Sequence, residues 1–183
     1  MTSQQLVVLA SAVYAVLLGV TIYFTRATTR RALAALAGGA AVAVVGFGLE
    51  VLCQALGLWR YPSDDTGYGP LAMYPALVLM FAVLPLIGWR VLRRFGWRGE
   101  VVFLAVIAVV GTVRDYQVER ATGFIALTPG IATVLVDLVA WSGLTALAQG
   151  VMRLVDGSAG ADRLARRPWE AAEPSAAPDP AGT

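Results

Sequence analysis

One long apolar stretch, at positions 32–59, most constrains how this chain can fold. It reads ALAALAGGAAVAVVGFGLEVLCQALGLW and carries a single charged side chain, Glu50. At about 1.5 Å of rise per residue, roughly 20 apolar residues cross the ~30 Å hydrocarbon core of a bilayer. We therefore expect a transmembrane helix here, with Glu50 inside the membrane at a cost of roughly 2–3 kcal/mol.

The composition agrees with a membrane protein and narrows its chemistry. Hydrophobic residues make up 58% of the chain and charged residues 14%, against about 45–50% and about 25% in soluble domains. The chain has no His and a single Cys, Cys53, so it lacks the usual zinc and haem ligands and cannot form an internal disulfide. We expect no metal and no cofactor. The sequence contains no compact basic patch interleaved with aromatic residues, so we expect no nucleic-acid partner.

Five apolar segments predict an all-α fold, a polytopic transmembrane bundle of five helices. The expected spans lie at about 6–24, 32–58, 71–92, 100–120 and 130–152, so that residues 1–156 form one transmembrane domain. The segment 157–183 ends in a Pro- and Ala-rich stretch and is expected to be a flexible cytoplasmic tail. Pro85 predicts a kink in the third span, and Thr128 followed by Pro129 predicts a capped start of the fifth.

The arginines predict the orientation of this bundle. With the N-terminus outside, 11 of the 14 basic residues fall on inner segments, and the outer side holds Arg60, Arg114 and Arg120. The positive-inside rule therefore places the N-terminus outside and the C-terminus inside. A chain that is rich in Ala and uses only Arg as its basic residue is typical of a GC-rich bacterial genome. We expect a multi-pass protein of the bacterial inner (plasma) membrane.

Small residues share one face of the second span and lead to its acid. Ala35, Gly39, Ala43 and Gly46 follow one another at steps of 4, 4 and 3 residues, and the next step reaches Glu50. Small side chains let helices approach closely in lipid. Glu50 is therefore expected to face another helix rather than acyl chains.

Further charges fall inside the fourth and fifth spans and predict a shared site. Counted along the helices, Glu50 and Asp137 both lie roughly 12–13 Å below the outer boundary, and Asp115 lies roughly 7 Å below it. Intramembrane ionisable groups usually face a bundle interior or a wet cavity and pair with one another. We expect these three acids to line one outward-facing pocket as acid–base groups. Arg114 and Glu119 would supply supporting charge, and a purely structural polar network is the alternative.

Three classes of function fit these observations. The sequence favours an interaction or assembly protein, with the lipid bilayer and another membrane protein as partners. The alternative is a metal-independent intramembrane acid–base enzyme, whose partner would be a hydrophobic small molecule of the lipid, isoprenoid or carotenoid-like class. An ion-coupled carrier subunit is the third class, which five spans without an internal repeat disfavour.

One pattern bears on the enzyme alternative. Glu50 in the second span is followed by an aromatic–Tyr–Pro stretch that ends with Tyr61 and Pro62. This order is faintly similar to integral-membrane carotenoid-modifying proteins. The resemblance implies a hydrophobic substrate of that kind and transfers no role to any residue.

Overall fold

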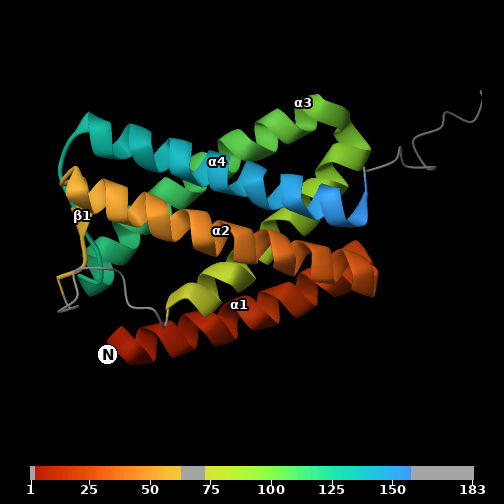
Figure 1. The fold of residues 1–183 in the computed structure, drawn as a ribbon, viewed down its shortest axis with the longest axis horizontal. Coiled ribbons are helices and arrows are strands. Elements are labelled where there is room, and N and C mark those ends of the chain that lie inside the picture. The colour runs from red at the N-terminus through yellow and green to blue at the C-terminus, as the bar shows by residue number, and fades with distance from the viewer. Residues whose placement is uncertain (1–2, 63–72, 158–183) are drawn as a thin grey trace, which may run out of the picture.

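The computed structural model describes residues 3–62 and 73–157, which form four helices and two short strands (Figure 1). All four helices are long and apolar enough to cross a membrane, so the helical membrane fold expected from the sequence is confirmed at that level. The start of the third predicted span at 71–72 and the predicted tail beyond Gly157 lie outside the described residues. In chain order the elements are α1 (Ser3–Thr25), α2 (Thr29–Ala55), β1 (Trp59–Arg60), α3 (Tyr74–Thr122), β2 (Ala126–Leu127) and α4 (Ile131–Asp156).

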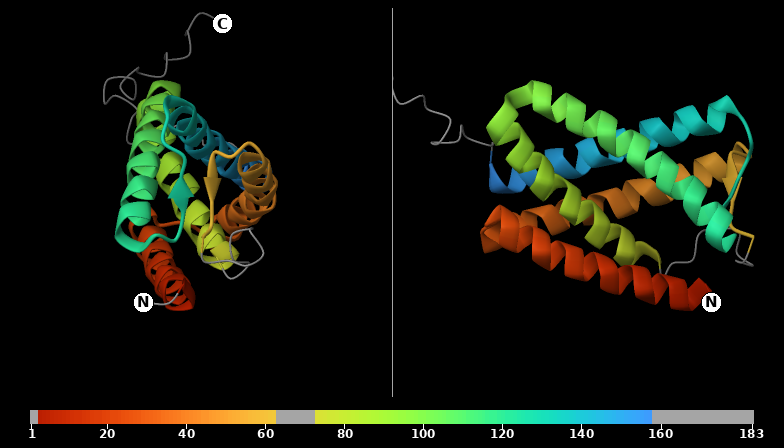
Figure 2. Two further views of the ribbon diagram at one scale, coloured as in Figure 1. Left: turned by 90° about the vertical axis from the view of Figure 1, so that its left-hand side faces the viewer. Right: turned by 180° about the vertical axis from the view of Figure 1, so that it is seen from behind.

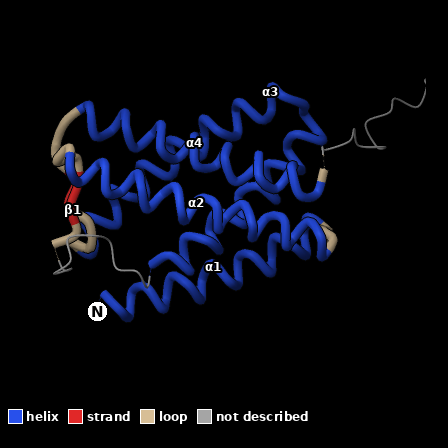
Figure 3. The backbone as a smooth tube through the Cα atoms, viewed as in Figure 1, coloured by secondary structure: helices blue, strands red, loops and turns tan. Residues whose placement is uncertain are grey.

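The third and fourth predicted spans form one helical element, α3, which is 49 residues long and broken at Gly96. Gly96 has φ 65° and ψ −162°, a conformation that essentially only glycine adopts because it has no Cβ. The chain turns back at this point, so a first limb (74–95) and a second limb (97–122) run in opposing directions (Figures 2 and 3). Pro85, where a kink was predicted, lies within helical residues of the first limb.

Glycines on α2 allow α3 and α4 to approach closely. A Cβ at Gly39 would overlap the carbonyl oxygen of Val78 in α3, and one at Gly38 would overlap the carbonyl oxygen of Ala148 in α4. Helix-to-helix packing of this kind is typical of membrane bundles, where small residues replace the hydrophobic effect as the means of close contact. The close approach expected at Gly39 is therefore confirmed. Helix α1 packs mainly against α3.

The strands β1 and β2 form a small antiparallel pair that closes one end of the bundle. Trp59 lies opposite Leu127 in this pair, and the N–H of Thr128 donates to the carbonyl of Leu58 at 2.8 Å. The predicted cap at Thr128 is wrong, because its hydroxyl donates to the carbonyl of Gly57 and α4 begins only at Ile131. The pairing fixes the end of α2 to the start of α4.

Charged residues tie the helices together at the opposite end, beside the Gly96 turn. Arg31 of α2 lies 2.7 Å from Asp156 of α4 and 4.2 Å from the centre of the Trp89 ring. Glu100 of α3 forms an ion pair with Arg153 of α4 at 3.3 Å. The sequence analysis did not identify these pairs, because their members are far apart in the chain and only the fold brings them together.

Candidate active-site cavity

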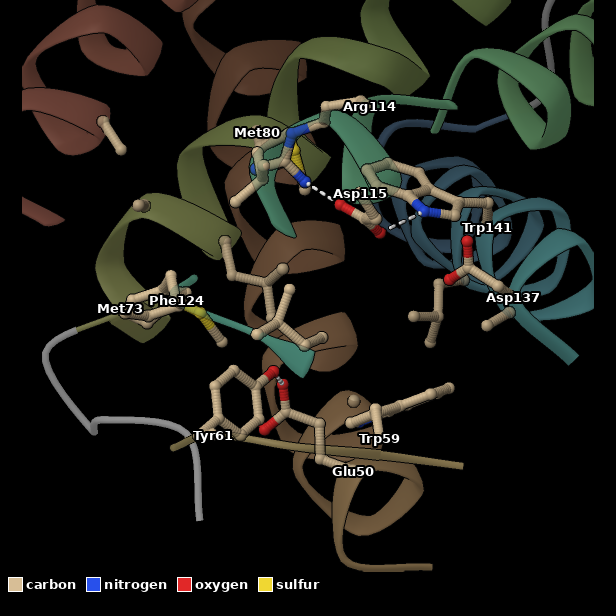
Figure 4. A pocket seen from close by; sticks show the side chains of 18 of the residues that line it. Glu50, Trp59, Tyr61, Met73, Met80, Arg114, Asp115, Phe124, Asp137 and Trp141 are labelled. Atoms are coloured by element: carbon tan, nitrogen blue, oxygen red, sulfur yellow. Dashed lines mark hydrogen bonds and ion pairs between the residues drawn. The ribbon is translucent and has the colours of Figure 1, made fainter. Parts of the chain in front are cut away.

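A cavity of about 280 Å³ lies in the half of the bundle that β1 and β2 close (Figure 4). All four helices and both strands contribute to its wall. Most of its lining is apolar or aromatic, and its charged lining residues among those described are Glu50, Arg114, Asp115 and Asp137. A concave, largely apolar site with a few polar groups is the usual form of a small-molecule pocket.

The structure brings four of the five predicted site residues to this one cavity. Glu50 comes from α2, Arg114 and Asp115 from the second limb of α3, and Asp137 from α4. Glu119 does not line the cavity, because its carboxylate accepts the backbone N–H of Leu127 at 2.9 Å and so holds β2 in place. Its expected role as a supporting charge stays a prediction, and the hydrogen bond adds a structural role at β2. The acid–base roles of the other residues stay predictions.

Glu50 is held by two tyrosines, one on each carboxylate oxygen. The hydroxyl of Tyr61 donates to Oε1 at 2.7 Å, and the hydroxyl of Tyr74 donates to Oε2 at 2.8 Å. Burial and then the neighbouring Glu50 carboxylate raise the pKa of Tyr61 above its ordinary value, so this phenol remains a proton-carrying donor. Tyr61 lines the cavity and Tyr74 does not. Glu50 thus presents its carboxylate to the cavity in a fixed orientation.

Asp115 is held on the other side of the cavity by a cation and an indole. Arg114 Nη1 donates to Asp115 Oδ1 at 2.8 Å, and Trp141 Nε1 donates to Oδ2 at 2.8 Å (Figure 4). The Trp141 ring fits here because Gly111 has no side chain, since a Cβ there would overlap the indole. The same ring stacks on Phe81, with centroids 5.6 Å apart and planes 24° apart. Both oxygens of Asp115 are therefore satisfied next to a cation.

Asp137 differs from the other two acids because it is buried and incompletely bonded. Only 6% of the Asp137 residue is exposed, and its buried Oδ2 atom has no hydrogen-bond partner among the described residues. The hydroxyl of Thr112 lies near the carboxylate but does not meet the geometry of a hydrogen bond. An unbonded polar atom in an apolar interior costs free energy. Such an atom is therefore more typical of a reacting group than of a structural network.

The sequence analysis missed three aromatic groups of the site. Tyr61 and Tyr74 hold Glu50, and Trp59 lines the cavity with a buried Nε1 atom that has no hydrogen-bond partner in the described segments. For two of them the sequence contained a signal, because the aromatic residues Trp59 and Tyr61 alternate with Arg60 and Pro62. In the structure the two aromatic residues are buried and the other two are exposed. Alternating burial is the pattern of an extended segment, which turns every second side chain to one face.

The described residues contain no group of three or more His, Cys, Asp and Glu side chains placed to hold a metal ion. Comparison of the chain with models of protein families, with curated proteins and with solved structures found no match. The site is therefore interpreted from its own residues.

Proposed function

We propose that this protein is an integral membrane enzyme that adds protons to, and removes them from, carbon atoms of a hydrophobic substrate. The substrate class is a lipid, an isoprenoid or a carotenoid-like molecule with a carbon–carbon double bond. One observation carries the proposal: a single largely apolar cavity is lined by carboxyl groups from three helices, held in three different ways. General acid–base catalysis needs a proton donor and an acceptor within reach of one substrate.

The proposed reaction begins with Asp137 as the proton donor. In its protonated form, Asp137 would give its proton to one carbon of the double bond, so that an O–H bond breaks and the π electrons form a C–H bond. This step leaves a carbocation and the Asp137 carboxylate. A carboxylate of the cavity then takes a proton from the carbon next to the cationic carbon, and the product is an isomerised alkene. If a second double bond of the substrate attacks the carbocation before a proton is lost, a ring forms. If water attacks the carbocation and then loses a proton, an alcohol forms.

The cavity wall suits a positively charged intermediate. The aromatic residues Phe81, Phe124 and Trp141 line the cavity, and an aromatic ring whose face meets a cation attracts it by roughly 0.5–2 kcal/mol when desolvated. Asp115 has both oxygens bonded beside Arg114 and would, in its ionised form, supply a negative charge of fixed position. Fixed charges and dipoles aimed at a developing charge are the main source of rate acceleration in many enzymes.

The proposed placement in the membrane has five passes, with the N-terminus outside and the C-terminus inside, in a bacterial inner membrane. A straight α3 of 49 residues would be about 74 Å long, more than twice the ~30 Å hydrocarbon core. The turn at Gly96 divides this length into two limbs, and each is long enough for one pass. The arginine distribution supports the orientation. The cavity then lies in the outer half of the bundle.

The test is transfer of solvent deuterium to carbon. Membranes containing the full chain are incubated in D₂O with linear isoprenoid alcohols and polyene hydrocarbons, and carbon-bound deuterium is measured by mass spectrometry. We expect incorporation with the wild type and its loss in Asp137→Asn and Glu50→Gln. Glu119→Gln is the matched control, because it changes a neighbouring acid outside the cavity. Equal incorporation in wild type and Asp137→Asn, or none above empty membranes, contradicts the proposal.

The assembly role that the sequence favoured predicts a different outcome of the same substitutions. An assembly protein would tolerate Glu50→Gln and Asp137→Asn and would copurify with a membrane partner through its outer helix faces. The cavity moves our proposal to the enzyme class because three acids and Tyr61 line one largely apolar cavity inside the bundle, whereas a protein partner would contact the outer helix faces.

A further inference from the structure

The apolar part of the cavity contains one position, Gly46, that is small for no reason of helix packing. Gly46 of α2 lines the cavity, and a Cβ built there would meet only the Leu77 side chain, at an ordinary contact distance of 3.6 Å. By contrast, Gly38 and Gly39 on the same helix are required by the carbonyl groups packed against them. Ala10 of α1 lines the same cavity. Gly46 therefore leaves space in the cavity rather than space for a neighbouring helix, and Ala10 has a small side chain at the wall of the same cavity.

Helix α1 separates this space from the surroundings of the bundle by a single layer. Leu6, Val7, Ala10 and Tyr14 face the cavity, whereas Val8, Leu9, Val13 and Val16 on other faces of α1 are 47–66% exposed. In a membrane those exposed faces lie against acyl chains. Because α1 packs mainly on α3, the wall between the bilayer and the cavity depends on one helix with one main packing partner.

Polar groups mark where the functional end of a ligand would lie. Glu50 and Tyr61 lie on one side of the cavity, Arg114 and Asp115 on the other, and Asp137 beside Trp141 (Figure 4). Asp137 is more than nine-tenths buried, and its Oδ2 atom has no hydrogen-bond partner in the part of the chain that the structure describes. Gly46 lies beside Leu77, and apolar residues such as Leu49 and Met80 line the same cavity as Ala10 and Gly46. The polar groups therefore fit a reacting group, and the space at Ala10 and Gly46 fits hydrocarbon.

We infer that the cavity takes a hydrocarbon chain from the bilayer past α1, and that Ala10 and Gly46 are the positions that determine whether the chain fits. The inference rests on the proposed function for the chemistry at the acids, but the binding of the chain does not depend on that chemistry. Larger side chains at these two positions fill the space that the chain needs, whereas larger side chains at exposed positions of the same helices do not.

The test measures contact between the chain and Trp141 in vesicles of phosphatidylcholine carrying bromine on one acyl chain, because bromine quenches tryptophan fluorescence on contact. The contribution of Trp141 is the difference between the full-length protein and its Trp141→Phe variant. We expect bromine to quench this contribution in the wild type. Gly46→Leu should lose most of the quenching, and Gly48→Leu should keep it, because Gly48 is exposed with open space around it.

A second pair of variants covers the case in which Gly46→Leu does not fold, as judged by its size-exclusion profile. Ala10→Phe should lose most of the quenching of Trp141, and Ala12→Phe should keep it, because Ala12 is exposed on α1 and does not line the cavity. Absence of quenching in the wild type overturns the inference. Equal quenching in the cavity variants and their controls overturns it too.

Failure of this inference and failure of the proposed function give different results. Quenching that depends on Gly46 without any deuterium transfer to carbon identifies a lipid-chain site without catalysis, so the inference stands and the enzyme proposal fails. Deuterium transfer without quenching of Trp141 by brominated chains identifies a substrate that reaches the acids by another route, so the enzyme proposal stands and the inference fails.

Discussion

Glu50 illustrates how the fold orients one acid inside an apolar bundle. The Glu50 carboxylate accepts two phenol hydroxyls, at 2.7 Å and 2.8 Å, and these two hydrogen bonds fix its position. Asp115 is instead held by Arg114 and Trp141, and Asp137 keeps one buried oxygen that has no hydrogen-bond partner within residues 3–62 and 73–157. Three acids of similar chemistry thus have three different environments, which is the usual way in which one site separates an acid from a base.

The two tyrosines on Glu50 allow a matched experiment at the residue scale. Tyr61→Phe and Tyr74→Phe each remove one hydrogen bond to the same carboxylate, so we expect each to lower the free energy of unfolding by about 1.5–3 kcal/mol. Only Tyr61 lines the cavity, so Tyr61→Phe should lower deuterium transfer to carbon more than Tyr74→Phe does. Thermal unfolding in detergent and the D₂O assay measure the two effects. Equal losses of activity would show that the tyrosines only hold Glu50 in place.

Glu119 should behave as a structural acceptor. Glu119→Ala removes the acceptor of the Leu127 N–H, so we expect a loss of about 1–3 kcal/mol in the free energy of unfolding. Glu119→Gln keeps a side-chain oxygen that can accept this bond, so its stability and its deuterium transfer should stay close to wild type. Thermal unfolding compares the two variants. A marked loss of activity in a stable Glu119→Gln protein would return Glu119 to the site.

At the scale of elements, the turn at Gly96 decides how α3 fits a bilayer. A helix of 49 residues cannot lie in a ~30 Å core as one straight rod. Gly96 reverses the chain and brings the second limb, with Arg114 and Asp115, back to the end of the bundle that holds Glu50. The position of two site residues therefore depends on the backbone conformation of one glycine about 20 residues away.

The requirement for glycine at the turn can be measured against a glycine within a helix. Gly96→Ala places a Cβ on a residue with φ 65° and ψ −162°, which should lower the free energy of unfolding by about 1–3 kcal/mol. Gly48→Ala changes a helical glycine with open space around it and should raise that free energy by about 0.5–1 kcal/mol. Thermal unfolding in the same detergent compares the two. A Gly96→Ala protein as stable as wild type would contradict the backbone argument.

At the scale of the whole molecule, the cavity lies at one end of the bundle, and the ion pairs of Arg31 with Asp156 and of Glu100 with Arg153, which join different helices, lie at the other. β1, β2 and the acids are at one end, and the Gly96 turn is at the other with Arg31, Asp156 and the Glu100–Arg153 pair. Ion pairs at the arginine-rich end join α2, α3 and α4. This end is held by charged contacts between helices, so the opposite end can contain a cavity without loss of the bundle.

The proposed five-pass arrangement predicts that these two ends face different sides of the membrane. In a Cys53→Ser background, Arg60→Cys places a thiol at an exposed position of β1, and Trp97→Cys places one beside the Gly96 turn, where Trp97 is 69% exposed. A membrane-impermeant maleimide added to intact cells should label Arg60→Cys and leave Trp97→Cys unlabelled. Labelling of both from outside, or of Trp97→Cys alone, would contradict the proposed orientation and number of passes.

The sequence by itself determined that this chain forms apolar membrane-type helices and where its unusual charges lie. Long apolar runs leave the backbone no means of satisfying its hydrogen bonds in lipid except as helices, and Glu50, Asp115 and Asp137 are conspicuous within them. The tertiary structure decided what those acids contact. Tyr61, Tyr74 and Trp141 reach them from distant segments, and Glu119 turns away to hold β2. Helical periodicity gives the face on which a side chain lies, but its partner depends on how the helices pack against one another.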